Sequence, residues 1–127
     1  MAPIIPALND SEIERVLEAA RAHGATEAGY VVLRLPLEIK DLFREWLTTE
    51  FPDRAQRVIK ILRTMRGGKD YDATWGLRQR GTGPYADQIA ARFRLALKRF
   101  GLNERRLLLR TDQFQPPRAS GQQMRLL

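Results

Sequence analysis

Hydrophobic residues follow two different patterns along this chain. Near the N-terminus two short apolar runs, Ile4-Ile5 and Tyr30-Val31-Val32-Leu33, flank a segment with helical spacing. Strands buried on both faces of a parallel sheet have continuous apolar runs of this kind. A run, a helix and a second run in this order predict a β-α-β unit, in which a crossover helix joins two parallel strands.

Four segments repeat their apolar residues with the period of an α-helix. Gly24, Gly67-Gly68 and Gly101 follow three of them as stop signals, and Pro36, Pro52 and Pro84 stand at helix starts. Asn9 or Asp10 is expected to cap the first helix, with Glu12 completing a capping box. The apolar stripes are Ile13, Val16, Leu17 and Ala20; Ile39, Leu42, Phe43, Trp46 and Leu47; Ala55, Val58, Ile59, Leu62 and Met65; and Ile89, Phe93, Leu97 and Phe100.

The predicted fold class is therefore α/β, with a helical region after the second strand. One β-α-β unit cannot cover both faces of its own sheet. Its two strands are expected to belong to a larger sheet, so the chain looks like part of a larger protein. A further short strand is predicted at residues 107–109, and the tail beyond Pro116-Pro117 is predicted to be extended.

The composition narrows the function classes. Of 127 residues, 43% are hydrophobic and 29% are charged, which is typical of a globular domain. The chain has no cysteine, which excludes disulfides, thiolate zinc sites and a cysteine-held iron–sulfur cluster within it. No apolar run approaches the length of a membrane span and no signal peptide is recognisable. A cytoplasmic protein with no membrane contact is the expectation.

Charge is distributed unevenly along the chain. Residues 1–53 contain 5 basic and 10 acidic side chains, whereas residues 54–127 contain 17 basic and 5 acidic ones. A basic half beside an acidic half indicates a polyanionic partner or an acidic surface elsewhere in a larger protein. The alternative is a solvated, arginine-rich surface with no specific partner.

The most polar stretch without helical period is the loop at residues 67–83. Lys69, Arg78 and Arg80 supply positive charge, and Tyr71 and Trp75 offer faces on which bases can stack. These five residues are the predicted nucleic-acid-binding site. The loop lacks the spacing of a P-loop. The alternative is a basic loop whose aromatic residues pack on the core.

Polar groups also follow the two predicted strands, where ligands of parallel sheets bind. Asn9 and Asp10 come after the first run and Arg34 after the second. The alternative roles are structural: Asn9 and Asp10 cap a helix, or Arg34 pairs with Asp10. The single histidine, His23, stands beside Gly24 at a helix end, so no Ser-His-Asp set is expected.

Several blocks of the sequence resemble a known family. The blocks are Ala2-Pro3-Ile4-Ile5-Pro6-Ala7-Leu8-Asn9-Asp10-Ser11-Glu12-Ile13, Gly29-Tyr30-Val31-Val32-Leu33-Arg34-Leu35-Pro36, Arg66-Gly67-Gly68-Lys69-Asp70-Tyr71-Asp72, Arg80-Gly81-Thr82-Gly83-Pro84-Tyr85-Ala86 and Gln115-Pro116-Pro117-Arg118. In order along the chain they are similar to the later half of radical SAM proteins of the DNA-repair-photolyase-like group, relatives of spore photoproduct lyase. Ala7 stands where that group is expected to have glycine.

The resemblance implies the end of a partial (β/α) TIM-type barrel at residues 1–66. A basic loop, a helix and an extended tail would follow at residues 67–127. Such proteins bind S-adenosylmethionine and a [4Fe–4S] cluster, which three cysteines hold in a Cys-x3-Cys-x2-Cys loop, and they carry out 5′-deoxyadenosyl-radical chemistry. By this resemblance Val32, Leu33 and Arg34 would line the adenosine side of the cofactor, with Pro6 and Asn9 at the same rim.

Three functions remain open at this point. The first is a C-terminal fragment or split subunit of a radical SAM protein, inactive alone, whose partner is an N-terminal half carrying the cluster loop. The second is a nucleic-acid-binding module that uses the basic half and the loop. The third is an interaction domain that completes a barrel with a separate chain.

Overall fold

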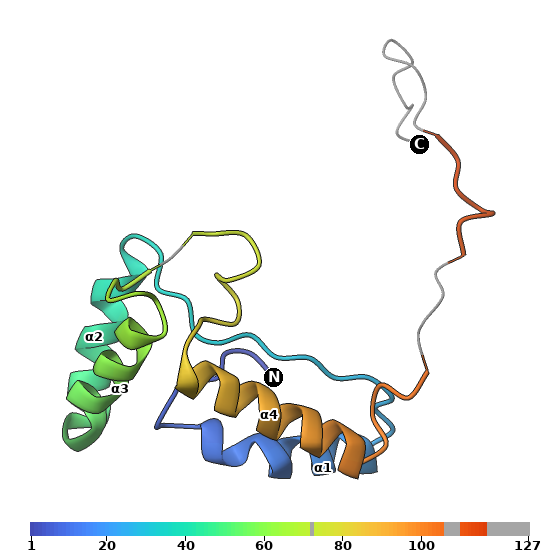
Figure 1. Ribbon diagram of the computed structural model, residues 1–127, viewed down its shortest axis with the longest axis horizontal. Coiled ribbons are helices and arrows are strands. Elements are labelled where there is room, and N and C mark those ends of the chain that lie inside the picture. Colours follow the sequence, from blue (N-terminus) through green and yellow to red (C-terminus); the bar gives the residue numbers. More distant parts are fainter. Residues whose placement is uncertain (72, 106–109, 117–127) are drawn as a thin grey trace, which may run out of the picture.

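The described part of the chain contains four α-helices, which pack as two pairs (Figure 1). The computed structural model describes residues 1–71, 73–105 and 110–116. After the short 3₁₀-helix η1 (Asp10–Glu12), α1 (Ile13–Ala22) packs against α4 (Pro84–Arg99), and α2 (Ile39–Glu50) packs against α3 (Pro52–Thr64). In Figure 1, α1 and α4 run side by side in the same direction, whereas α2 and α3 form an antiparallel hairpin.

The helix boundaries follow local sequence signals. Pro52 and Pro84 occupy the first turns of α3 and α4, where a missing N–H costs no hydrogen bond. Beyond α1, Gly24 has φ +92°, and beyond α4, Gly101 has φ +63°. Both glycines take the left-handed conformation that ends a helix. Asn9 stands at the N-cap position of η1 as predicted, but its side chain makes no capping hydrogen bond, so the predicted capping box is not formed.

The predicted α/β fold is wrong, because the described residues contain no β-strand and no sheet. The two apolar runs do lie side by side, but they meet in one isolated parallel bridge between Ile4 and Val32. Ile4 N–H donates to the Val31 carbonyl at 2.8 Å, and Leu33 N–H donates to the Ile4 carbonyl at 2.9 Å. Neither a β-α-β unit nor a partial TIM-type barrel forms in the described chain.

Pro6 explains why the pairing ends on one side of the bridge, because the next donor of a parallel ladder would be the N–H of residue 6, which proline lacks. On the other side the Val31 N–H donates to the Met1 carbonyl at 3.1 Å, so the two runs stay in contact there. After buried Pro6 the chain turns at Ala7, whose φ is +60°. On the side away from Ile4, the Val32 N–H donates to the carbonyl of Gln79 at 2.8 Å, and Gln79 lies in an irregular loop. The apolar runs therefore predicted strands wrongly and burial only in part, since Ile4, Tyr30 and Val32 are buried whereas Ile5, Val31 and Leu33 are half-buried.

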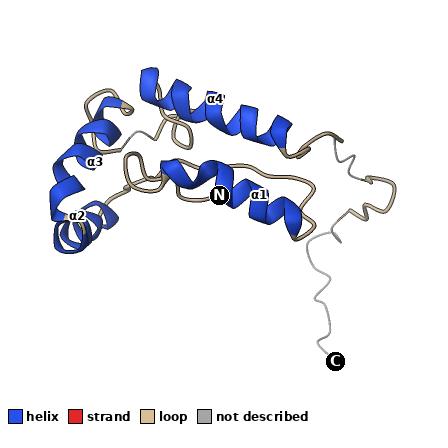
Figure 2. Ribbon diagram, turned by 90° about the horizontal axis from the view of Figure 1, so that it is seen from below, coloured by secondary structure: helices blue, strands red, loops and turns tan. Residues whose placement is uncertain are grey.

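The two apolar runs form the centre of the core. Ile4 and Val32 are fully buried, and Tyr30 packs its ring against Phe93 of α4 with centroids 4.6 Å apart. In Figure 1 the extended chain that contains the second run lies along one side of the α1–α4 pair, and Figure 2 shows it as loop. The predicted boundary between residues 66 and 67 stays a prediction, and buried residues from both sides of it share one core.

Helix α2 buries much less of its apolar stripe than the sequence predicts. Leu47 is fully buried, but Leu42 is 63% exposed and Trp46 is 42% exposed. The Trp46 ring instead packs against Phe43 and Phe51, with centroids 5.6 and 5.4 Å apart. α2 therefore contacts the core through one edge of its apolar face.

Two sequence predictions fall outside the described residues, namely the strand at residues 107–109 and the tail beyond Pro117. Among the described residues, no helix is both long enough and apolar enough to cross a membrane.

Candidate nucleic-acid interface

A buried arginine anchors the basic loop at residues 67–83. Arg66, only 3% exposed, follows α3 and precedes Gly67 and Gly68, which both have positive φ. Its guanidinium donates to the Leu33 carbonyl at 3.0 Å and to the Leu77 carbonyl at 2.9 Å. One cation thereby ties the loop to the second apolar run. The sequence places Arg66 off the apolar stripe of α3, and its burial follows from contacts distant in sequence.

Asp70 is used inside the protein and does not neutralise the exposed cations of the loop. Its carboxylate accepts a hydrogen bond from Arg44 of α2 at 2.7 Å and lies 3.8 Å from Nε of Arg63. Among the described residues, Lys69, Arg78 and Arg80 form no ion pair with any carboxylate. The loop therefore presents positive charge to solvent.

Trp75 is an exposed aromatic residue of the loop, and half-buried Arg78 lies against its ring. Trp75 is 82% exposed, and the Arg78 guanidinium lies 4.3 Å from the centroid of the Trp75 ring. A tight turn brings them together, because Arg78 N–H donates to the Thr74 carbonyl at 3.0 Å and Gly76 between them has φ +85°. The alternative that Trp75 packs on the core is wrong.

Two of the remaining residues of the predicted site, Arg80 and Tyr71, contact other parts of the chain. Arg80 stacks on Tyr30, with its guanidinium 3.9 Å from the ring centroid. The Tyr71 hydroxyl accepts a hydrogen bond from Arg34 at 3.2 Å. Arg34, predicted for a different site, therefore lies beside Tyr71, and its buried Nε has no hydrogen-bond partner. Lys69 is exposed.

Backbone and side-chain groups of the residues implied to bind the cofactor form hydrogen bonds within the chain. Val32 and Leu33 donate their N–H groups to Gln79 and Ile4, and the Leu33 carbonyl accepts from Arg66. The Asn9 side chain accepts from Ile5 N–H at 2.7 Å and donates to the Pro3 carbonyl at 3.1 Å. Pro6 is fully buried.

The N–H groups of Val32 and Leu33 and the Asn9 amide are thus hydrogen-bonded within the chain. No cluster of three or more potential metal ligands occurs among the described residues. Without cysteine, this chain offers no thiolate to a [4Fe–4S] cluster. The cofactor residues stay a prediction that depends on the resemblance alone.

Tyr85 closes the turn that follows the first apolar run, a role that the sequence alone does not indicate. Its hydroxyl accepts from Ala7 N–H at 3.1 Å and donates to Asp10 at 2.6 Å. Burial raises the pKa of Tyr85, and the hydrogen bond to the Asp10 carboxylate raises it further. The phenol therefore remains protonated and holds this turn at neutral pH.

The chain matches no protein-family model, no curated protein and no solved structure. Its resemblance to radical SAM proteins therefore depends only on the sequence blocks that suggest it.

Proposed function

We propose that this protein binds single-stranded nucleic acid through the platform formed by Trp75 and Arg78. The observation that carries the proposal is the exposed indole with a guanidinium stacked on it, in a loop whose cations Lys69, Arg78 and Arg80 form no ion pair with the carboxylates that the structure describes. Bases stack on aromatic side chains with a gain of roughly 1–3 kcal/mol each, and arginine adds a cation–π contribution. Paired bases in a duplex do not offer these faces, so unpaired strands are the ligand.

Lys69 and Arg80 supply phosphate contacts beside the platform in this proposal. Arg80 keeps its guanidinium on Tyr30, and the residue remains exposed. Tyr71 acts differently from the sequence prediction, since its hydroxyl is held by Arg34 and it positions the loop. A cytoplasmic location is part of the same proposal.

The test is fluorescence anisotropy of a labelled oligo(dT) titrated with protein at several salt concentrations. We expect Trp75→Ala to weaken binding by roughly 5- to 100-fold, the loss of one stacked base. Arg78→Gln is expected to flatten the slope of log affinity against log salt by about 0.7. Trp46→Ala removes the other tryptophan, and Arg15→Gln removes an exposed arginine of α1; both serve as matched controls with wild-type affinity.

Two outcomes would contradict this function. One is wild-type affinity in Trp75→Ala with an unchanged melting temperature. The other is equal weakening by Arg15→Gln and Arg78→Gln, which would show attraction by net charge without a site.

A second function is favoured by one observation in the turn at residues 5–9. Ala7 has φ +60°, and this is the position at which the resemblance to radical SAM proteins expects glycine. A glycine-type conformation at the expected place supports descent from that group. In this second proposal the chain is a C-terminal fragment or split subunit, and its partner is an N-terminal chain with a Cys-x3-Cys-x2-Cys loop.

The test of the second function is co-expression with the product of a neighbouring reading frame that carries this cysteine motif. A stable complex in which a [4Fe–4S] cluster forms would support it, and the chain alone should form none. Failure of the two chains to co-purify would exclude the split-subunit form.

A further inference from the structure

A cleft of about 630 Å³ lies between α2 and α3, apart from the Trp75–Arg78 platform. Its floor is aliphatic: Leu47 is fully buried, Ala55 is nearly so, and Ile59 is half-buried. This volume lies within the range of small-molecule sites, which are typically apolar with a few polar groups that orient the ligand.

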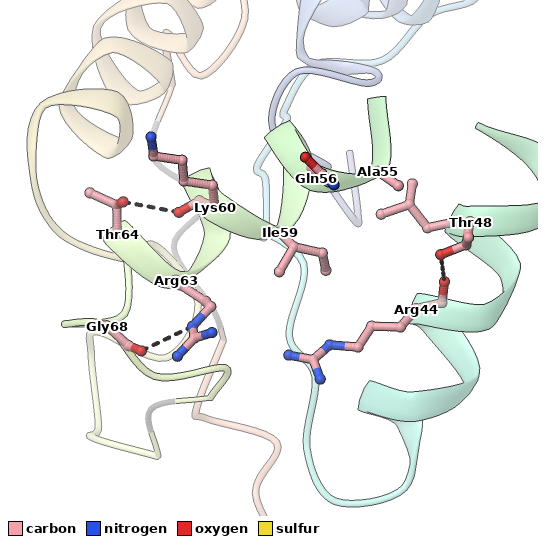
Figure 3. Close-up of a pocket in the computed structure, with 10 residues that line it drawn as sticks. Arg44, Thr48, Ala55, Gln56, Ile59, Lys60, Arg63, Thr64 and Gly68 are labelled. Atoms are coloured by element: carbon pink, nitrogen blue, oxygen red, sulfur yellow. Dashed lines mark hydrogen bonds between the residues drawn. The ribbon is translucent and has the colours of Figure 1, made fainter. Parts of the chain in front are cut away.

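The polar groups around the cleft are cationic. Arg44 comes from α2, and Lys60 and Arg63 come from α3; none of the described residues that line the cleft is a carboxylate. Figure 3 shows Arg44 and Arg63 reaching toward each other from the two helices, whereas Lys60, one turn earlier on α3, extends away from them. A cleft with three cations in its lining is complementary to a negative ligand.

At one end of the cleft, other residues already hold the Arg44 and Arg63 side chains in place. Asp70 accepts a hydrogen bond from Arg44 at 2.7 Å and lies 3.8 Å from Nε of Arg63. Arg63 Nε also donates to the Gly68 carbonyl at 3.1 Å. Two guanidinium groups thus share a single carboxylate, so this end keeps a net positive charge and both cations are held in place.

Of the three neutral polar side chains in the described lining, Thr48, Gln56 and Thr64, two are used within their own helices, which favours a ligand with few polar atoms. Thr48 donates its hydroxyl to the Arg44 carbonyl at 2.8 Å, and Thr64 donates to the Lys60 carbonyl at 2.9 Å (Figure 3). Both donors are consumed within their own helices. No aromatic side chain lines the cleft, so it offers no stacking face for a base.

We infer that the α2–α3 cleft binds a small amphipathic anion, a carboxylate on an aliphatic chain. The ligand carboxylate lies at the Arg44–Arg63 end of the cleft, where it shares the two guanidinium groups with Asp70, and the aliphatic chain lies on Ile59 and Ala55 above buried Leu47. The inference is independent of nucleic-acid binding, because it uses none of the residues of the Trp75–Arg78 platform.

The test is isothermal titration of the full chain with decanoate below its micelle-forming concentration. We expect saturable 1:1 binding that weakens about fourfold for each methylene removed, down to hexanoate. Decanol lacks the charge and acetate lacks the chain, so each is expected to bind at least tenfold more weakly. Adenosine monophosphate, a base with a phosphate, is expected to bind more weakly than decanoate.

Two variants locate the site. Lys60→Gln removes a cation that forms no ion pair among the described residues, so the fold is expected to be unaffected. Arg63→Gln is expected to weaken decanoate binding about tenfold, and Lys60→Gln more modestly. Lys98→Gln on α4 is the matched control. Trp75→Ala should bind decanoate like the wild type, which separates this inference from the proposed function.

The inference is overturned if decanoate binds without saturation, or if both cleft variants bind like Lys98→Gln. Binding of adenosine monophosphate or acetate as tight as that of decanoate would also overturn it, since the cleft would then recognise a nucleotide or any anion.

Discussion

Ala7 is the residue at which the backbone is most clearly constrained. Its φ of +60° lies in the left-handed region, where a residue with a Cβ is less stable by about 1–2 kcal/mol. The surrounding contacts impose this conformation: Ala7 N–H donates to Tyr85, and Asn9 bonds back to Ile5 and Pro3. Such strain persists where neighbouring interactions over-determine the backbone.

Replacing Ala7 by glycine should therefore stabilise the protein. The strain is removed, and part of the gain is offset by the larger freedom of glycine in the unfolded chain. We expect a net gain of about 0.5–1 kcal/mol in the free energy of unfolding, measured by urea denaturation.

Ala91→Gly is the matched control for this change, since Ala91 is exposed within α4. There the same substitution should destabilise by about 1 kcal/mol. Destabilisation by Ala7→Gly would show that residue 7 is not held in the left-handed region.

At the scale of elements, an ion pair joins α1 to α4. Arg92 donates to the Glu14 carboxylate through Nε at 3.0 Å and through Nη2 at 2.6 Å. These hydrogen bonds lower the pKa of Glu14, although partial burial opposes the shift. Both side chains are about one-third exposed, so the pair is expected to contribute at most about 1 kcal/mol.

The pH dependence of this pair follows from the direction of the shift. Because the folded-state pKa of Glu14 is depressed, its stabilisation is present above the unfolded value of 4.5 and is lost as pH falls through the folded value. The free energy of unfolding should exceed that of Glu14→Gln at pH 7, and the difference should disappear toward pH 3. A difference that is constant between pH 7 and pH 3 would contradict this.

The helices could be predicted from the sequence because their signals are local. Proline in the first turn of α3 and α4, glycine after α1, α3 and α4 and one apolar stripe in each helix are recognisable without tertiary information, although α2 begins at Ile39 and not at Pro36 as predicted. The strands could not be predicted, because a sheet needs a further strand beside Val32. The Val32 N–H instead bonds to Gln79, which lies in a loop. Likewise the apolar stripe of α2 predicts an amphipathic helix, but it does not predict that Leu47 alone among the residues of the stripe is fully buried.

At the scale of the whole molecule, the site could be predicted only in part. Composition and spacing correctly identified a charged, exposed loop containing Trp75 and Arg78. They could not identify Arg66 and Tyr85, whose partners lie far away in the sequence. They also could not reveal that Asp70 is turned toward Arg44, which leaves the loop positively charged.

The most direct test of the account is the fluorescence of Trp75 itself. Trp46→Phe leaves Trp75 as the single tryptophan of the chain. A base that stacks on the indole should quench its emission, so oligo(dT) should quench it with the same midpoint as in anisotropy, and salt should reverse both signals. Inorganic polyphosphate, which has charge but no bases, should not quench it. If oligo(dT) binds to this variant and the Trp75 emission does not change, the platform is not the binding site and the central claim is wrong.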